Sequence, residues 1–154
     1  MTHPLCAITG PTSGIGEATA LDLAQRGYRL ILVCRNETKG KALAQRCRDA
    51  GASEVAVELC DLASIESVRQ AGQRMAASYP CLDILINNAG RSIRRAIEHS
   101  YDRFHDFQRT MQLNYFGCLR LSLGVLPDMS ERRSGQIINI SSMGVVGPPP
   151  RFSA

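Results

Sequence analysis

The sequence predicts an α/β fold built on a doubly wound parallel sheet, and three observations support this prediction. Short, mostly apolar runs recur along the 154 residues, as expected for strands buried on both faces. Amphipathic segments separate the runs, and glycine or polar residues follow most of them. The runs are Leu5–Thr9, Arg29–Cys34, Glu54–Cys60, Leu82–Asn87 and Gln136–Ile140.

The segments between the runs have helical periodicity. In Ser64–Tyr79, apolar residues step by three and four and form a single stripe. The stripe comprises Ile65, Val68, Gly72, Met75 and Tyr79. After Gly16, one side of the expected helix carries Ala20, Leu21, Leu23 and Ala24. Strand–helix–strand repetition predicts parallel strands joined by right-handed crossovers.

Composition is that of an ordinary soluble globular domain, with 44% hydrophobic and 21% charged residues. The net charge of +4 is scattered, so it does not favour nucleic-acid binding, and a phosphate-bearing small ligand explains it as well. The six cysteines form no CxxC and the three histidines have no ligand spacing, so we expect reduced thiols and no metal site. No signal peptide or run of ~20 apolar residues is visible, so we expect a cytoplasmic protein with no transmembrane segment.

The residues that follow the five runs have the chemistry of a ligand site. In open parallel sheets, ligands bind outside the carboxyl ends of the strands. Five separate segments therefore predict one functional edge. The residues at the ends are Gly10, Arg35, Asp61, Asn87–Gly90, Ser141 and Ser142.

The stretch Thr9–Gly16, TGPTSGIG, lies between the first run and the first helix. Its glycines permit a tight turn and a close approach of a pyrophosphate, and the helix that starts near Ile15 offers free N–H groups and the positive end of its dipole. We interpret it as a dinucleotide-binding turn, and the alternative is a structural turn without a ligand. The expected cofactor-binding residues here are Gly10, Thr12, Ser13, Gly14, Ile15 and Gly16.

Cofactor choice is predicted from the end of the second run. NAD-binding folds place an acidic residue about 20 residues after the glycines, where it holds the ribose 2′-hydroxyl. Here Cys34-Arg35-Asn36 contains no acid, and Arg35 offers a planar fork of donors to a 2′-phosphate. We therefore expect NADP(H) over NAD(H), and the alternative is a solvated arginine.

Asn114 is the unusual member of an apolar stripe in Tyr101–Met129. Its spacing predicts a place on the buried face, where an unpaired amide costs on the order of 1–3 kcal/mol. The amide is satisfied by a helix carbonyl, or it holds a water or a catalytic side chain. The stripe comprises Phe104, Phe107, Met111, Asn114, Cys118, Leu121 and Val125.

Taken together, these motifs resemble the short-chain dehydrogenase/reductase family. The matching pieces are Thr9–Gly16, Asp61-Leu62, Asn87-Asn88-Ala89-Gly90, Asn114 and Asn139-Ile140-Ser141-Ser142. The resemblance implies a Rossmann sheet with strand order 3-2-1-4-5. Asn87–Gly117 looks like the reductase domain of bacterial fatty acyl-CoA reductases, and the front part looks like retinol-dehydrogenase-type members.

The resemblance also implies roles for individual residues. Asp61 and Leu62 would contact the adenine, while Asn87, Asn88, Ala89 and Gly90 would support the sheet near the ribose. Asn114 would join a proton relay, and Ser142 would hold and polarise a substrate carbonyl. Hydride would pass between the nicotinamide and the carbonyl or alcohol group of a lipid-like small molecule. The resemblance also implies that the full-length protein is a homo-oligomer.

The resemblance further implies a tyrosine that donates the proton and a lysine one helical turn later. The tyrosine follows the serine by roughly thirteen residues, which lands on position 155. The only lysines, Lys39 and Lys41, lie early, and no tyrosine here starts a YxxxK. We therefore expect residues 1–154 to be an NADP(H)-binding Rossmann domain, truncated after the fifth strand, incomplete at its C-terminus and inactive alone. The alternative function is a non-catalytic NADP(H)-binding or sensor module.

The substrate is less defined by the sequence. Arg91, Arg94 and Arg95 follow the fourth run closely. They form either a contact for coenzyme A phosphates or a solvated loop.

Overall fold

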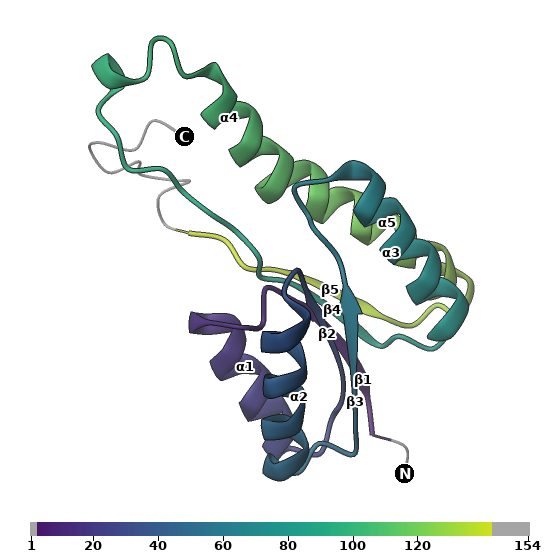
Figure 1. The fold of residues 1–154 in the computed structure, drawn as a ribbon. Helices are drawn as coiled ribbons and strands as arrows, with labels where there is room; N and C mark the ends of the chain where they lie inside the picture. The colour runs from purple at the N-terminus through teal and green to yellow at the C-terminus, as the bar shows by residue number, and fades with distance from the viewer. Residues whose placement is uncertain (1–2, 143–154) are drawn as a thin grey trace.

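The computed structural model describes residues 3–142, which form a five-stranded parallel sheet between two layers of helices (Figure 1). The strand order is β3-β2-β1-β4-β5, as predicted, and every neighbouring pair is parallel. Predicted and observed strand ends differ by at most two residues. The strands are β1 (Leu5–Thr9), β2 (Arg29–Cys34), β3 (Glu54–Leu59), β4 (Ile84–Asn87) and β5 (Gln136–Asn139).

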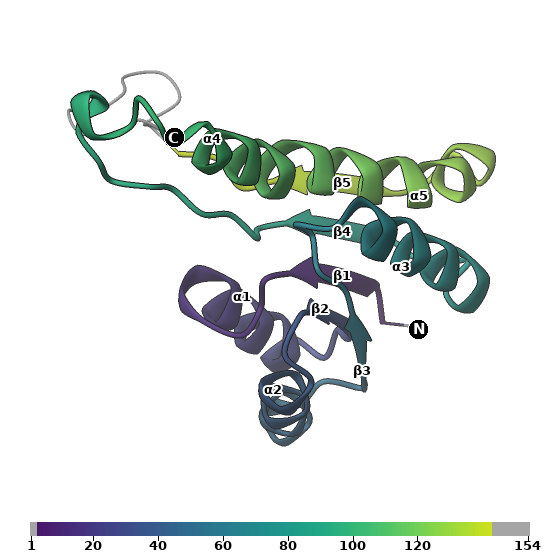
Figure 2. The ribbon, with the colours of Figure 1, turned by 45° about the horizontal axis from the view of Figure 1, so that its top comes forward.

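The helices lie on both faces of the sheet. Helices α1 and α2 cover one face, and α3 and α5 cover the other (Figure 2). Within residues 3–142, none of the helices has the length and apolar character needed to cross a bilayer. The helices are α1 (Gly14–Gln25), α2 (Glu37–Ala50), α3 (Ile65–Ser78), α4 (Phe104–Met111) and α5 (Cys118–Glu131), with a 3₁₀ turn at Ile97–His99 and a π-helical segment at Gln112–Gly117.

The central strands supply the core on both sides. In β1, Leu5 and Ala7 pack toward α3 and α5, while Cys6 and Ile8 pack toward α1 and α2. Successive side chains point to opposite faces, so a strand covered on both sides must be apolar throughout. This is the physical reason for the unbroken apolar runs of β1 and β2.

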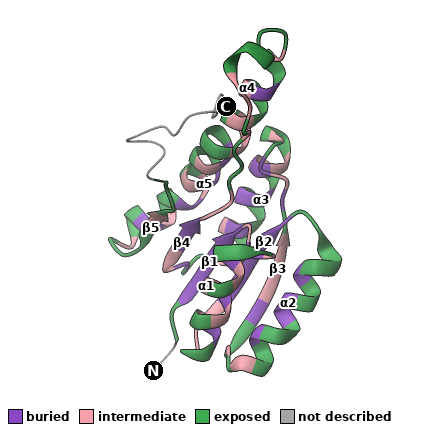
Figure 3. Ribbon diagram, turned by 90° about the vertical axis from the view of Figure 1, so that its left-hand side faces the viewer, coloured by how far each residue is buried: buried purple, intermediate pink, exposed green. Residues whose placement is uncertain are grey.

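The expectation of burial on both faces is wrong for the edge strands. The backbone of β5 pairs only with β4, and Ile140 just beyond it is 46% exposed. In β3, the other edge strand, both terminal residues are exposed and three of the four between them are of intermediate burial, whereas much of the centre of the sheet is coloured as buried (Figure 3). A strand with one neighbour cannot be enclosed as a central strand is.

Helices α3 and α5 meet at two glycines. A Cβ atom built on Gly124 would lie 3.2 Å from the Cα atom of Gly72. Because both residues lack a side chain, the helix backbones approach closely over the sheet. Gly72 lies in the predicted stripe of α3, which is buried at Val68 and Met75, while Ile65 at the helix start is exposed.

The burial of the thiols gives a simple test of this fold. The cysteines are free, and burial raises the pKa of Cys6 to about 12 and that of Cys60 to about 11. Cys81 lies exposed in the turn before β4. Because the thiolate is the reactive form, a maleimide at pH 7.5 should label Cys81 first and the half-buried Cys118 more slowly. The four buried cysteines, Cys6, Cys34, Cys47 and Cys60, should stay protected until denaturant is added. Peptide mapping by mass spectrometry measures the order, and early labelling of Cys6 or Cys60 would contradict the fold.

Candidate functional site

Thr9 joins the ends of β1 and β4. Its side chain is buried, with only 1% of the residue exposed. The hydroxyl oxygen accepts hydrogen bonds from the backbone N–H groups of Asn88 and Ala89, both at 3.0 Å, and donates to the Ile86 carbonyl at 3.4 Å. One hydroxyl therefore fixes the backbone that follows β4 against the last residue of β1.

The side chain of Asn88 fastens the same two segments from the other direction. Its Nδ2 donates to the carbonyl oxygens of Thr9 at 3.0 Å and Gly10 at 3.2 Å. Gly10 has φ +62°, and a Cβ there would lie 2.9 Å from the Cα atom of Ala89. A Cβ on Gly16 would collide with the Gly10 carbonyl and with Asn88. The glycines are required because two backbone segments and a helix meet here.

The N-terminus of α1 is open where the glycine turn meets it. Gly14 has φ +58°, and a Cβ there would meet no atom within 4 Å. The Ser13 side chain makes no capping hydrogen bond, and Ile15 is 68% exposed. The first-turn amides have no intrahelical acceptor and lie at the positive end of the helix dipole, so they suit a phosphate. This open cradle fits the pyrophosphate of a dinucleotide.

Arg35 lies at the end of β2, directly before α2. Its side chain is exposed, and Asn36 caps α2 by accepting a hydrogen bond from the Lys39 amide at 2.9 Å. The Gly10 amide donates to the Val33 carbonyl at 3.1 Å, which ties the glycine turn to this end of β2. A cation and a second helix N-terminus therefore flank the glycine turn.

Asp61 and Leu62 follow β3 at the same edge. One oxygen of the Asp61 carboxylate accepts from the Ala63 amide at 3.0 Å, which closes a tight turn. Leu62 is buried in the core cluster under α3 and α5, and a Cβ on Gly117 would lie 2.5 Å from its carbonyl. This arrangement places the backbone of the pair, and the carboxylate of Asp61, at the edge of the sheet.

Asn87 is buried between β4, β5 and α5. Its Nδ2 donates to Asn139 Oδ1 at 2.9 Å and to Ser122 Oγ at 3.0 Å. Ser122 in turn donates to the Cys118 carbonyl at 2.9 Å. This polar network fixes the end of β5, which leads to Ser141 and Ser142.

The structure contradicts the predicted place of Asn114. Its side chain is exposed, and Phe104 and Met111 of the same stripe are also exposed. The expected helix of Tyr101–Met129 is divided by the π-helical segment, which widens one turn and shifts the phase of the stripe. Only its later part, with Leu121 and Val125, reaches the core.

Both polar atoms of the Asn114 side-chain amide are nevertheless hydrogen-bonded. Its Oδ1 accepts from the Arg91 amide at 2.9 Å, and its Nδ2 donates to the Arg91 carbonyl at 2.7 Å. The partner is thus the main chain after β4, where the prediction offered a helix carbonyl, a water or a catalytic side chain. Asn114 therefore holds the chain just after Gly90, where it leaves the end of β4.

The family model described as short chain dehydrogenase matches residues 5–154. The chain belongs to this family. This confirms the resemblance that the motifs of the glycine turn and of β4 indicated. Members are oxidoreductases, and the residues described here lie outside the carboxyl ends of the parallel strands, where ligands bind in open sheets of this kind.

Individual relatives and solved structures match nearly the whole of this chain. A fatty acyl-CoA reductase of Acinetobacter baylyi is 48% identical over 147 residues, which cover 96% of this chain and 50% of that protein. The structure of L-sorbose reductase from Gluconobacter frateurii with NADPH and L-sorbose has a TM-score of 0.90 and 29% identity, covering 99% of this chain and 57% of that one. An NAD⁺-bound xylitol dehydrogenase has a TM-score of 0.88 and 28% identity, covering 99% and 58%. The chain spans about half the length of the curated relatives it matches.

The sequence prediction of the site omitted Thr9. The sequence places Thr9 at the end of the first apolar run and at the start of the glycine-turn motif, and neither pattern assigns a role to its hydroxyl. A polar residue that ends an otherwise apolar run was the available signal, because a buried hydroxyl needs partners.

Replacing Thr9 by valine keeps the shape of the side chain and removes the hydroxyl. Two amides, of Asn88 and Ala89, then lose their acceptor, so the free energy of unfolding should fall by about 2 kcal/mol or more. Urea denaturation measures the loss. The exposed Thr38→Val is the matched control and should change stability by less than about 0.5 kcal/mol. Equal effects of the two substitutions would show that Thr9 does not join the strands.

Proposed function

We propose that this chain is the NADP(H)-binding part of a short-chain dehydrogenase/reductase that transfers hydride between nicotinamide and a carbonyl or alcohol. The observation that carries the proposal is the open N-terminus of α1, held by Thr9 and Asn88 at the edge that also bears Ser142. The pyrophosphate would lie on the amides of Gly14, Ile15 and Gly16. Family membership favours an enzyme over a non-catalytic binding or sensor module.

NADP(H) rather than NAD(H) is proposed on the chemistry of Arg35. Its exposed guanidinium stands where a 2′-hydroxyl-binding acid would stand in an NAD-dependent protein. A guanidinium matches a phosphate with two parallel donors. The adjacent N-terminus of α2 adds to the favourable potential for an anion. The related solved structures include both NADPH and NAD⁺ complexes, so the preference rests on this side chain.

Replacing Arg35 by alanine should weaken NADPH binding about 10- to 100-fold, because charge-assisted hydrogen bonds contribute about 1.5–3 kcal/mol. NADH binding should change less than threefold, since NADH has no 2′-phosphate. Titration of cofactor fluorescence measures both dissociation constants. The exposed Arg26→Ala, at the far end of α1, is the control. Tighter NADH than NADPH binding by the unaltered protein would contradict the proposal.

The proposed chemistry assigns separate tasks to the nicotinamide, Ser142 and Asn114. The nicotinamide, when bound, supplies or accepts the hydride. Ser142 would donate a hydrogen bond to the substrate oxygen and so polarise the carbonyl where charge develops. Asn114 would keep the loop after β4 in place through both polar atoms of its amide.

Ser142→Ala in the intact protein tests this assignment. Loss of a donor at the developing oxyanion should lower kcat about 100- to 1,000-fold while NADPH binding stays within about twofold. Steady-state reduction of decanal with NADPH measures the first, and fluorescence titration measures the second. Ser78→Ala, an exposed serine at the end of α3, is the control. A kcat within threefold of the unaltered enzyme would remove Ser142 from the chemistry.

A lipid-like substrate is proposed because the relative of Acinetobacter baylyi is named a fatty acyl-CoA reductase. Arg95 is a weaker candidate for contact with coenzyme A phosphates, because it already pairs with Asp106. Arg91 is exposed and is proposed as a phosphate contact.

We also propose a cytoplasmic homo-oligomer. Helix α5 presents Leu119, Leu123 and Leu126 as exposed large apolar residues on its outer side. Contiguous exposed apolar residues of this kind are typical of subunit contacts.

A further inference from the structure

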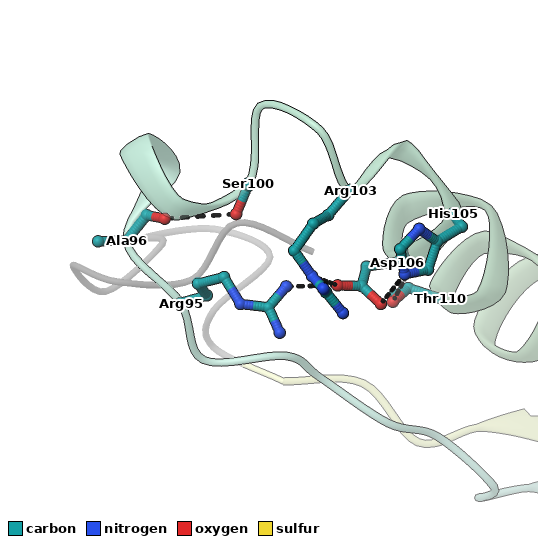
Figure 4. A network of polar contacts seen from close by, with 7 residues as sticks. All are labelled: Arg95, Ala96, Ser100, Arg103, His105, Asp106 and Thr110. Atoms are coloured by element: carbon teal, nitrogen blue, oxygen red, sulfur yellow. Dashed lines mark hydrogen bonds and ion pairs between the residues drawn. The ribbon is translucent and has the colours of Figure 1, made fainter.

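Asp106 is buried in the first turn of α4 although it carries a charge. It is 6% exposed, and no other charged side chain among residues 3–142 is buried. Its Oδ2 accepts from Arg103 Nε at 2.9 Å and from Arg95, and its Oδ1 lies 3.3 Å from His105 Nε2 (Figure 4). Such a carboxylate is tolerated in the interior only because charged donors surround it.

The two arginines come from one segment. We call residues 91–103, which connect β4 to α4, the arm. Arg95 lies in its middle and Arg103 at its end, so the Asp106 carboxylate closes the arm into a loop. Ser100, which is also buried, donates to the Ala96 carbonyl at 3.3 Å, and its own carbonyl accepts from the Arg103 amide at 3.0 Å.

Polar contacts hold the arm, whereas apolar packing holds the sheet against the helices on its two faces. Neither core cluster of the described chain includes a residue of the arm. Several large apolar residues at its tip, Ile97, Tyr101 and the adjoining Phe104, are exposed. The conformation of the arm therefore depends on the Asp106 contacts to an unusual degree.

The arm borders the part of the edge that bears Ser142. Strands β4 and β5 are paired up to their last residues, Asn87 and Asn139, and the Ile140 amide donates to the Asn87 carbonyl at 2.9 Å. The segments that follow the two strands therefore leave the sheet at adjacent points, and they run in the same direction (Figure 1). Asn114 fixes the base of the arm at Arg91.

The contacts of Asp106 persist over the pH range in which proteins are folded. Hydrogen bonds from Arg95, and then from Arg103, lower the pKa of the carboxyl to about 2. A lowered pKa stabilises the folded arm above the ordinary value of 3.8, and this stabilisation is lost only as the pH falls toward 2. The Asp106 carboxylate is therefore charged at neutral pH, as its ion pairs with Arg95 and Arg103 require.

We propose that Asp106 is a positioning residue that holds the arm as a preformed wall of the substrate site. The inference rests on the proposed function, since it assigns the wall to the site at Ser142. Cofactor binding should not depend on it, because Thr9 and Asn88 hold the glycine turn through separate contacts. A wall ordered in advance reduces the ordering cost of substrate binding.

The experiment compares Asp106→Asn with Asp49→Asn in the intact protein. Asp49 is an exposed carboxylate near the end of α2, so the control removes the same charge without touching the arm. Three quantities are measured: KM and kcat for decanal, the NADPH dissociation constant, and the rate of trypsin cleavage within the arm. Trypsin is informative because the arm contains four arginines, at 91, 94, 95 and 103.

For Asp106→Asn we expect a KM about tenfold higher or more, kcat within about threefold, and unchanged NADPH binding. Cleavage of the arm should accelerate about tenfold, with Asp49→Asn like the unaltered protein and Asp106→Glu recovering part of the change. If Asp106→Asn fails to fold, Arg95→Gln gives the same comparison, because it leaves the Arg103 contact in place.

Unchanged cleavage and unchanged KM would overturn the inference. A parallel loss of NADPH binding would also overturn it, because Asp106 would then support the whole fold. An unaltered protein that binds NADPH but reduces no carbonyl would contradict the proposed function and the substrate role of the arm. In that case faster cleavage of Asp106→Asn would still show that the contacts of Asp106 with Arg95 and Arg103 hold the arm.

Discussion

The junction between β1 and β4 is the constraint on which the functional edge depends. A single hydroxyl, that of Thr9, accepts two backbone amides, while Asn88 returns two hydrogen bonds to the glycine turn. The turn, the helix that follows it and the segment after β4 are therefore positioned by one set of contacts. Removal of the buried Thr9 hydroxyl would leave two backbone amides without their acceptor.

The same principle extends across the sheet to β5. Asn87 joins Asn139 and Ser122, so that the next strand end is held by side-chain amides in addition to the ladder. Polar residues at strand ends thus serve two purposes. They satisfy one another where the chain leaves the sheet, and they set the places from which the cofactor-binding turn and Ser142 project.

The segment between β4 and α5 is held by a different kind of interaction from the central strands. The central strands are fixed by apolar packing on both faces, whereas the arm is fixed by a buried carboxylate and two guanidinium groups. Buried ion pairs stabilise a fold weakly but specify geometry, since a misplaced partner leaves a charge unpaired. This difference explains why a segment with few apolar contacts has a defined course. The π-helical segment next to it lets Asn114 turn back to hold the base of the arm.

The sequence by itself determined the central strands, because strands buried on both faces must be apolar. Its motifs together indicated the family, and the strand order followed from that resemblance. The sequence also indicated which residues follow the strands at the functional edge. Only the tertiary structure decided that Asn114 is exposed and pairs with the main chain of Arg91, that Thr9 joins two strands, and that Arg95 belongs to Asp106. Periodicity assumes a regular helix, so it cannot register a π-helical turn. Hydrogen-bond partners far apart in sequence, such as Thr9 and Asn88, are chosen by the packing of the whole sheet.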